Sequence, residues 1–220
     1  MRVAGEDALA TLRRLRLLAI VTIADASRAV SVARALLNGG LPLAEVTLRT
    51  PTALDSIRRI AEEVPELALG AGTVLTPAQV RAVKSAGARF IVTPGFNPHV
   101  VDACREEGLP IFPGVATPTE IEAALEMDVR ILKLFPAESM GGIAYLKAIS
   151  GPYAGTGVSF VPTGGVTLEN LPAYLKLPTV IACAGSWLAP PGWIESGAYD
   201  RIEEETRRAV SQATAGPPPT

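Results

Sequence analysis

The chain is poor in the residues that many hydrolases and metalloenzymes use. Its 220 residues include one histidine, His99, and two cysteines. A Ser-His-Asp or Cys-His site is therefore excluded unless His99 serves as its base, and a histidine-rich zinc site is excluded outright. His99 follows Pro98 at the start of a predicted helix, where we expect a surface or capping role. From this composition we expect neither a metal site nor a cofactor.

Long apolar runs and strong net charge are also missing. No apolar run reaches the roughly 20 residues that a membrane-spanning helix needs. The net charge of -2 gives no sign of binding to nucleic acid or to an anionic membrane. No basic segment leading into an apolar stretch follows Met1, so we expect no signal peptide. Cys104 and Cys183 lie far apart, in an apparent helix and strand, which favours free buried thiols and a cytoplasmic protein.

Short apolar strands alternate with helical segments along the chain. We predict strands at residues 17–23, 43–48, 67–74, 88–93, 109–112, 129–134, 158–162 and 179–184. Eight such strand–helix units predict a (β/α)8 TIM barrel, because parallel barrel strands are apolar on both faces. An additional amphipathic helix at 7–16 precedes the first unit. We expect one barrel domain over residues 1–214 and a disordered, proline-rich tail at 215–220.

An open, doubly wound sheet is the alternative architecture for this pattern. Many such sheets carry a G-x-G-x-x-G fingerprint directly after the first strand. Here Ala24 and Asp25 follow that strand instead. The barrel is therefore the favoured fold, and 48% hydrophobic residues against 19% charged ones also make oligomerisation plausible.

Lysine is scarce too, and one of the four lysines stands in an unusual place. Lys84, Lys147 and Lys176 fall in segments with helical periodicity, whereas Lys133 lies between two leucines in an apolar strand. Burying an ammonium group costs several kcal/mol unless it is paired or loses its proton. A neutral amine can attack a carbonyl carbon and form a Schiff base. Lys133 is therefore either a catalytic nucleophile or one partner of a structural ion pair.

The second predicted strand has polar side chains on one face. Glu45, Thr47 and Arg49 alternate with Val46 and Leu48, so the three polar side chains point the same way. The apolar pair suits the helix layer, which places the polar face inside the barrel with Glu45 deep and Arg49 near the mouth. A deep carboxylate and a deep lysine form either a structural ion pair or a Schiff-base lysine with its acid–base partner.

Other candidate residues stand where the predicted strands end. Arg49 is either a surface arginine or, with Thr73, a bidentate grip on a substrate carboxylate, and Thr73 alone also suits a turn. Gly164-Gly165 and Gly185-Ser186 follow the seventh and eighth strands. Many barrels bind phosphate at these two places through backbone N–H groups. Glycine pairs are common in turns, but two pairs at these positions favour a phosphate site.

Six short motifs together carry a family resemblance. They are Glu45-Val-Thr-Leu-Arg49-Thr50, Gly70-Ala-Gly-Thr73-Val74, Thr93-Pro94-Gly95, Lys133-Leu-Phe-Pro-Ala-Glu138, Pro162-Thr-Gly-Gly165 and Gly185-Ser-Trp187. In this order they resemble the 2-keto-3-deoxy-6-phosphogluconate (KDPG) and 4-hydroxy-2-oxoglutarate (KHG) aldolase family. Its members are Schiff-base (class I) aldolases built on trimeric (β/α)8 barrels. The resemblance extends from about Leu17 to Gln212.

The resemblance implies an activity and a role for each matched residue. It implies reversible cleavage of KDPG, in the Entner-Doudoroff pathway of carbohydrate metabolism, to pyruvate and glyceraldehyde 3-phosphate. Cleavage of KHG to pyruvate and glyoxylate would be the sister activity. Lys133 would form the Schiff base and Glu45 would be the general acid–base. The remaining matched residues would hold the pyruvate carboxylate (Arg49, Thr73), wall the pocket (Pro94, Phe135) and line the phosphate end (Thr163, Gly164, Gly165, Gly185, Ser186).

The partners implied are a small 2-keto acid and two further copies of the chain, as a homotrimer. One departure concerns the first strand, where family members often carry proline or arginine and this chain has Ala19-Ile20-Val21-Thr22. The contribution of that strand to the pocket, and with it the substrate preference, is left open. Two other functions also remain open. One is a phosphosugar isomerase or epimerase with Glu45 as its base, and the other is a non-catalytic anion-binding barrel.

Overall fold

The structure is a computed structural model that describes residues 4–215, with side chains from residue 8 onward. Most of the tail that the sequence predicts to be disordered, residues 216–220, lies outside the described residues. Within the described part of the chain, no helix has both the length and the apolar character needed to cross a membrane.

All strand pairs in the structure are parallel, and they belong to two curled sheets. The larger sheet has the order β5-β4-β3-β2-β1-β9 and the smaller one the order β6-β7-β8. The strands are β1 (Leu17–Val21), β2 (Leu43–Thr47), β3 (Ala68–Gly72), β4 (Ile91–Val92), β5 (Ile111–Phe112), β6 (Gly114–Val115), β7 (Ile131–Leu134), β8 (Ser159–Pro162) and β9 (Cys183–Gly185).

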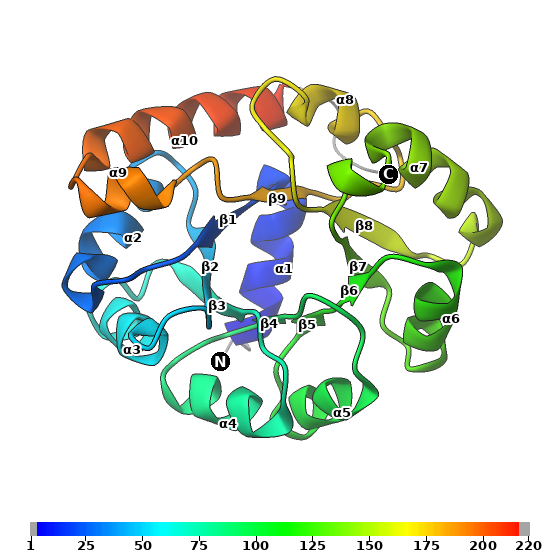
Figure 1. The fold of residues 1–220 in the computed structure, drawn as a ribbon, viewed down its shortest axis with the longest axis horizontal. Helices are drawn as coiled ribbons and strands as arrows, with labels where there is room; N and C mark the ends of the chain where they lie inside the picture. The colour runs from blue at the N-terminus through cyan, green and yellow to red at the C-terminus, as the bar shows by residue number, and fades with distance from the viewer. Residues whose placement is uncertain (1–3, 216–220) are drawn as a thin grey trace.

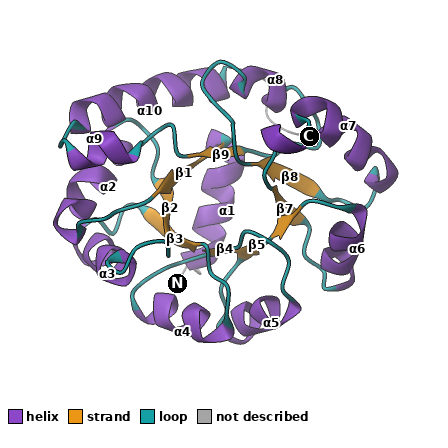
Figure 2. Ribbon diagram, in the orientation of Figure 1, coloured by secondary structure: helices purple, strands orange, loops and turns teal. Residues whose placement is uncertain are grey.

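The two sheets meet at both of their edges. β5 and β6 are parts of one extended segment that Pro113 divides, and the Pro113 carbonyl accepts a hydrogen bond of 2.9 Å from Lys133 N–H on β7. On the other side, isolated parallel bridges pair Phe160 with Val180 and Thr163 with Ala184. Figure 2 shows the strands surrounding a common centre, with all but one of the described helices outside them. The predicted α/β class with parallel strands is confirmed. The predicted fifth strand, residues 109–112, contains β5, and the extended segment continues beyond the prediction, past Pro113, as β6.

The described helices lie around the outside of the strands, except for α1, which stands in the middle of the view (Figure 1). They are α1 (Ala4–Leu15), α2 (Ala29–Asn38), α3 (Ala53–Glu63), α4 (Pro77–Ser85), α5 (Pro98–Glu106), α6 (Pro118–Glu126), α7 (Gly142–Ser150), α8 (Leu171–Leu175), α9 (Pro191–Glu195) and α10 (Tyr199–Thr214), with 3-10 turns at Ala26–Arg28, Glu138–Met140 and Gly151–Tyr153. The predicted capping box of α6 is present. The Thr117 hydroxyl accepts from Glu120 N–H, and the Glu120 carboxylate accepts from Thr117 N–H.

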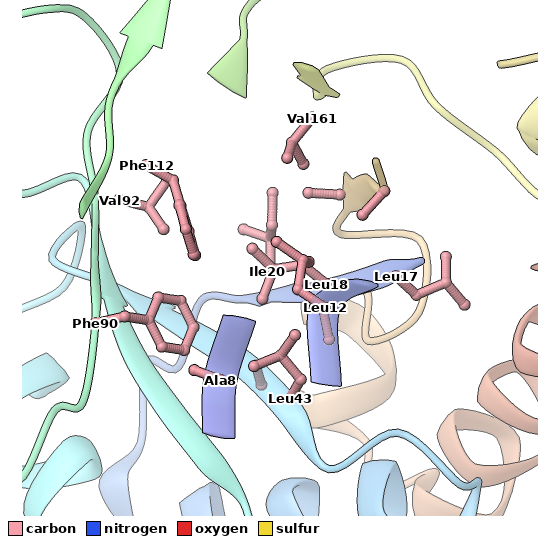
Figure 3. Packing of buried hydrophobic residues seen from close by; sticks show 14 of the residues in the cluster. Ala8, Leu12, Leu17, Leu18, Ile20, Leu43, Phe90, Val92, Phe112 and Val161 are labelled. Atoms are coloured by element: carbon pink, nitrogen blue, oxygen red, sulfur yellow. The ribbon is translucent and has the colours of Figure 1, made fainter. Parts of the chain in front are cut away.

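Helix α1 covers one end of the strands. Its side chains Ala8 and Leu12 are fully buried, and Figure 3 shows them directed into the same core as Leu18, Leu43 and Phe90. Leu43 is the first residue of β2, so α1 covers the amino-terminal side of the sheet. The carboxyl ends of the strands are left for the loops that carry polar residues.

Several element boundaries differ from the sequence prediction. Strand β4 has two residues where six were predicted, and α8 begins at Leu171 where Thr167 was predicted. The segment before α8 is a turn in which Thr167 N–H donates to the Asn170 side chain over 2.8 Å, and this local bond competes with the helix. Helix α9 was not predicted, because its Pro-Pro-Gly start favours a loop.

Candidate active site

A cavity of about 270 Å³ opens among residues from the carboxyl ends of the strands. Its lining comes from β1, β2, β7, β9 and the segments that follow β1, β2, β3, β7, β8 and β9. Every predicted site residue except Pro94 lines this cavity: Glu45, Arg49, Thr73, Lys133, Phe135, Thr163, Gly164, Gly165, Gly185 and Ser186. Residues that are up to 141 positions apart in the chain (45 and 186) thus share one volume.

Lys133 and Glu45 face each other inside the cavity. Lys133 lies in β7, with 8% of its surface exposed, and Glu45 lies in β2 with 1% exposed. The Lys133 Nζ is 3.6 Å from Glu45 Oε1, a separation at which the two charges attract but which is too long for a hydrogen bond. Neither Glu45 carboxylate oxygen has a hydrogen-bond partner among the described residues. The pair is therefore buried, and the hydrogen-bonding capacity of its carboxyl group is unsatisfied by the described residues.

The environment of Glu45 favours its protonated form. Burial raises the pKa of the Glu45 carboxyl above its ordinary value, and the nearby Lys133 and Arg49 cations only partly oppose this effect. Space for the carboxylate comes from Gly72 on β3. A Cβ atom at Gly72 would lie 2.7 Å from Glu45 Oε1, so only glycine fits there. A carboxyl group with a raised pKa takes up a proton more readily than an ordinary carboxylate does, which suits proton transfer.

The aromatic ring of Phe135 lies near the Lys133 amine. The Lys133 Nζ lies 5.3 Å from the centroid of the Phe135 ring, within cation–π range. Phe135 also contributes to the cavity lining, as predicted. Pro94 follows β4 but does not line the cavity. Its carbonyl instead lies against Gly114, where an added Cβ would come within 2.2 Å of the Pro94 oxygen.

Arg49 follows β2 and Thr73 follows β3, and these two strands are neighbours in the larger sheet. Arg49 is exposed, and Thr73 is partly buried. Thr73 has a φ of 58°, in the left-handed region that β-branched residues rarely adopt. Such backbone strain is concentrated at functional sites, where it fixes the direction of a side chain.

The loop after β8 turns its carbonyl groups away from the cavity. The Gly164 carbonyl accepts from Glu138 N–H over 3.0 Å, and the Gly165 carbonyl accepts from the Asn170 side chain over 3.1 Å. Both glycines have positive φ, 93° and 85°. Within the described residues, the N–H groups of Gly165 and Ser186 donate no hydrogen bond to the protein. Donors of this kind in a glycine loop suit an anion.

Glu138 packs against this loop, and Tyr174 in turn binds Glu138. A Cβ at Gly165 would come within 2.5 Å of the Glu138 Cβ, so the loop packs closely on Glu138. The Tyr174 hydroxyl donates to the Glu138 carboxylate. Burial raises the pKa of the Tyr174 hydroxyl well above its usual range, and the hydrogen bond to Glu138 adds a smaller effect in the same direction. The contact therefore joins the segments after β7 and β8 through a neutral tyrosine.

Some cavity residues were not assigned a role by the sequence analysis. Ile20 and Thr22 line the cavity, so the first strand does contribute to it, and Thr47 does so beside them. The Thr22 and Thr47 hydroxyl oxygens are 2.8 Å apart. In the sequence, the signal for Thr22 was its place as a polar residue at the end of an otherwise apolar strand. Further lining comes from Val166, Ala189 and Pro191.

The amino-acid sequence matches a known protein family and its members over most of the chain. The family model described as KDPG and KHG aldolase matches residues 9–205. The chain is 46% identical over 203 residues to a 2-dehydro-3-deoxy-phosphogluconate aldolase of Treponema pallidum, covering 92% of this chain and 93% of that protein.

Solved structures of similar proteins have the same fold. One is the KDPG aldolase of Legionella pneumophila with pyruvate captured at low pH as a covalent carbinolamine intermediate. It has a TM-score of 0.87 and 37% identity, over 92% of this chain and 97% of that one. Another is the KDPG aldolase of Zymomonas mobilis with 3-phosphoglycerate. It has a TM-score of 0.85 and 33% identity, over 94% and 96% of the two chains.

Proposed function

The chain belongs to the KDPG and KHG aldolase family, and from this membership we infer that it is a Schiff-base (class I) aldolase. Its reaction is the reversible cleavage of KDPG to pyruvate and glyceraldehyde 3-phosphate. Cleavage of KHG to pyruvate and glyoxylate is the second activity named for the family. The observation that carries this function is the buried lysine–glutamate pair inside a cavity at the carboxyl ends of parallel strands.

We propose that Lys133 is the nucleophile. Its amine adds to the C2 ketone of the substrate to give a carbinolamine, and loss of water leaves a cationic imine. The imine nitrogen accepts the electron pair of the C3–C4 bond when that bond breaks. Because the amine is buried, with Glu45 and the Phe135 ring close to it, little water competes for the imine before cleavage.

Glu45 is the proposed general acid–base. Its carboxylate takes the proton of the C4 hydroxyl, directly or through one water, as C3–C4 cleavage turns C4 into an aldehyde. The remaining fragment is the enamine of pyruvate on Lys133. Glu45 returns the proton to C3, and water then releases pyruvate and the free amine. The raised pKa of Glu45 suits both directions of this transfer.

The two ends of the substrate have separate binding groups in this proposal. Arg49 and Thr73 hold the carboxylate next to the reacting ketone. The phosphate at the far end is held by the loops at Gly164-Gly165 and Gly185-Ser186, with Thr163 beside them. The unpaired N–H groups of Gly165 and Ser186 support this assignment. Phe135 walls the pocket, and the same role for Pro94 remains a prediction from the family motif.

We further propose that the two curled sheets together form one (β/α)8 barrel domain over residues 1–214. The joined edges at Pro113 and at the Thr163–Ala184 bridge support closure. A cytoplasmic homotrimer is proposed from the family resemblance.

A direct assay tests the function. Purified protein should release pyruvate from KDPG, and the Lys133→Met variant should lose at least about four powers of ten in kcat. The matched control is Lys84→Met, which removes an exposed amine that pairs with Glu107; its kcat should stay within about twofold. Pyruvate release by Lys133→Met at the wild-type rate would contradict the proposal.

A further inference from the structure

The Thr22–Thr47 hydroxyl pair is a polar feature of the cavity that the mechanism does not use. Thr22 directly follows β1 and Thr47 ends β2, and the strand register, which sets Val21 opposite Val46, brings the two threonines opposite each other. Their hydroxyl oxygens lie 2.8 Å apart, and either one can donate to the other. Both side chains line the cavity, with Thr47 buried and Thr22 partly buried.

The pair retains hydrogen-bonding capacity that neighbouring threonines have used. Thr50 and Thr52 both donate to the Ile23 carbonyl, over 2.6 and 2.8 Å. By contrast, no second hydrogen-bond partner for Thr22 or Thr47 exists among the described residues. Two hydroxyls have two protons, and their mutual bond uses one. One O–H donor and several lone pairs are therefore available to a molecule in the cavity.

The position of the pair relates to the two ends of the substrate. In the ring order, β1 lies between β2 and β9. The proposed carboxylate site follows β2 and β3, and the proposed phosphate site follows β8 and β9. A substrate held at both ends therefore passes β1 with its middle carbons. The C4 hydroxyl of KDPG is taken up by Glu45, which leaves the C5 hydroxyl as the next polar group along the chain.

We propose that Thr22 and Thr47 form the subsite that recognises this C5 hydroxyl, which is the C2 hydroxyl of glyceraldehyde 3-phosphate. The proposal rests on the aldolase function proposed above. One threonine donates to the substrate hydroxyl while the other accepts from it, so a hydroxylated aldehyde gains bonds that glyoxylate cannot make. Because the pair remains bonded to itself when the substrate hydroxyl is missing, we expect moderate discrimination, about 10-fold to 100-fold.

The test measures the reverse reaction, aldol addition of pyruvate to an aldehyde, and compares two aldehydes. They are D-glyceraldehyde 3-phosphate and 3-phosphooxypropanal, which keeps the aldehyde and the phosphate but lacks the hydroxyl. The wild type should prefer the first by about 10-fold to 100-fold in kcat/KM. Thr22→Val, which keeps the side-chain shape, should lose most of this preference by losing activity on the hydroxylated aldehyde alone. Thr22→Ser, which restores a hydroxyl, should recover it.

Controls separate this subsite from the function as a whole. Thr50→Val removes a hydroxyl bonded to the backbone outside the cavity and should affect both aldehydes equally. Thr22→Val should still form a borohydride-reducible adduct with pyruvate, which has no such hydroxyl. Equal losses on both aldehydes in Thr22→Val, or an unchanged preference, would overturn the subsite. A wild type without the pyruvate adduct would instead overturn the aldolase function.

Discussion

Glu45 is buried beside a cation, and the balance of these two effects sets its protonation. Burial is the larger effect and raises the pKa of the carboxyl above its ordinary value of 4.5, while Lys133 and Arg49 lower it. When the folded-state pKa of a carboxyl group is raised, the folded protein binds the proton more tightly than the unfolded chain does. Stability is then lost as the pH rises from the unfolded pKa through the folded one. The residue needed for proton transfer therefore reduces stability at neutral pH.

Replacing this carboxyl by its neutral analogue should separate stability from activity. Glu45→Gln should raise the free energy of unfolding at pH 7–8, since the raised pKa means that the charged carboxylate is less favourable in the folded protein than in the unfolded chain. The gain should shrink as the pH falls through the folded-state pKa and should be lost below the ordinary value of 4.5, where wild-type Glu45 is protonated in both states. Aldolase activity should fall by at least about 100-fold.

Denaturant melts of both proteins across the pH range, with kinetics at neutral pH, make this measurement. The control is Glu62→Gln, which neutralises an exposed carboxylate on α3 and should change neither quantity appreciably. A Glu45→Gln protein that is less stable than the wild type at pH 8 would show that attraction to Lys133 outweighs burial, against our account.

The positions of some helices and strands could be predicted from the sequence alone, and those of others could not. Strands such as β2 and β7 were predicted from apolar runs, and the shared face of Glu45, Thr47 and Arg49 follows from the two-residue period of a strand. The three side chains line the cavity, which confirms that face. Segments whose conformation depends on distant partners were predicted less well. β4, for example, has two residues, and its register with β3 is given by one residue pair, Ala71 with Ile91.

Contacts between elements could not be inferred from any periodicity. Tyr174 and Glu138 are 36 residues apart, and nothing in either local sequence shows that one donates to the other. The Thr22–Thr47 pair likewise depends on which residues of β1 and β2 face each other. Pro94 belongs to a family motif, yet it packs on Gly114 outside the cavity lining. The site residues that were predicted are those carried by motifs at the strand ends.

The proposed phosphate site in the loops after β8 and β9 leads to a prediction about substrate preference. Ser186 is exposed and lines the cavity, so Ser186→Glu places a carboxylate at the proposed phosphate site. Each charge-assisted hydrogen bond is worth roughly 1.5–3 kcal/mol, so losing one or two should lower kcat/KM for KDPG by at least about 10-fold. Cleavage of KHG, whose shorter chain reaches these loops poorly, should fall much less.

Kinetics on both substrates with the same variant give the comparison. Ser211→Glu adds the same charge on exposed α10, away from the cavity, and should leave both rates nearly unchanged. Equal losses on KDPG and KHG in Ser186→Glu would mean that these loops are structural turns.

At the scale of the whole molecule, the fold leaves one end of the strands for chemistry. Helix α1 packs against the opposite end through Ala8 and Leu12 (Figure 3). The polar side chains of the cavity lie at the carboxyl ends. Both cysteines are buried and free, as predicted, and burial raises the pKa of the Cys104 thiol to about 12. They offer no thiolate to compete with Lys133 as a nucleophile at neutral pH.

The central claim is that Lys133 forms an imine with a 2-keto acid, and reductive trapping tests it most directly. Protein treated with pyruvate and borohydride should lose activity and gain one reduced adduct per chain. Peptide mass spectrometry should locate this adduct on Lys133, because only a neutral amine beside the bound ketone forms a reducible imine. Omitting pyruvate should leave the protein active. An intact mass without any adduct, or an adduct on Lys84, Lys147 or Lys176, would contradict the account.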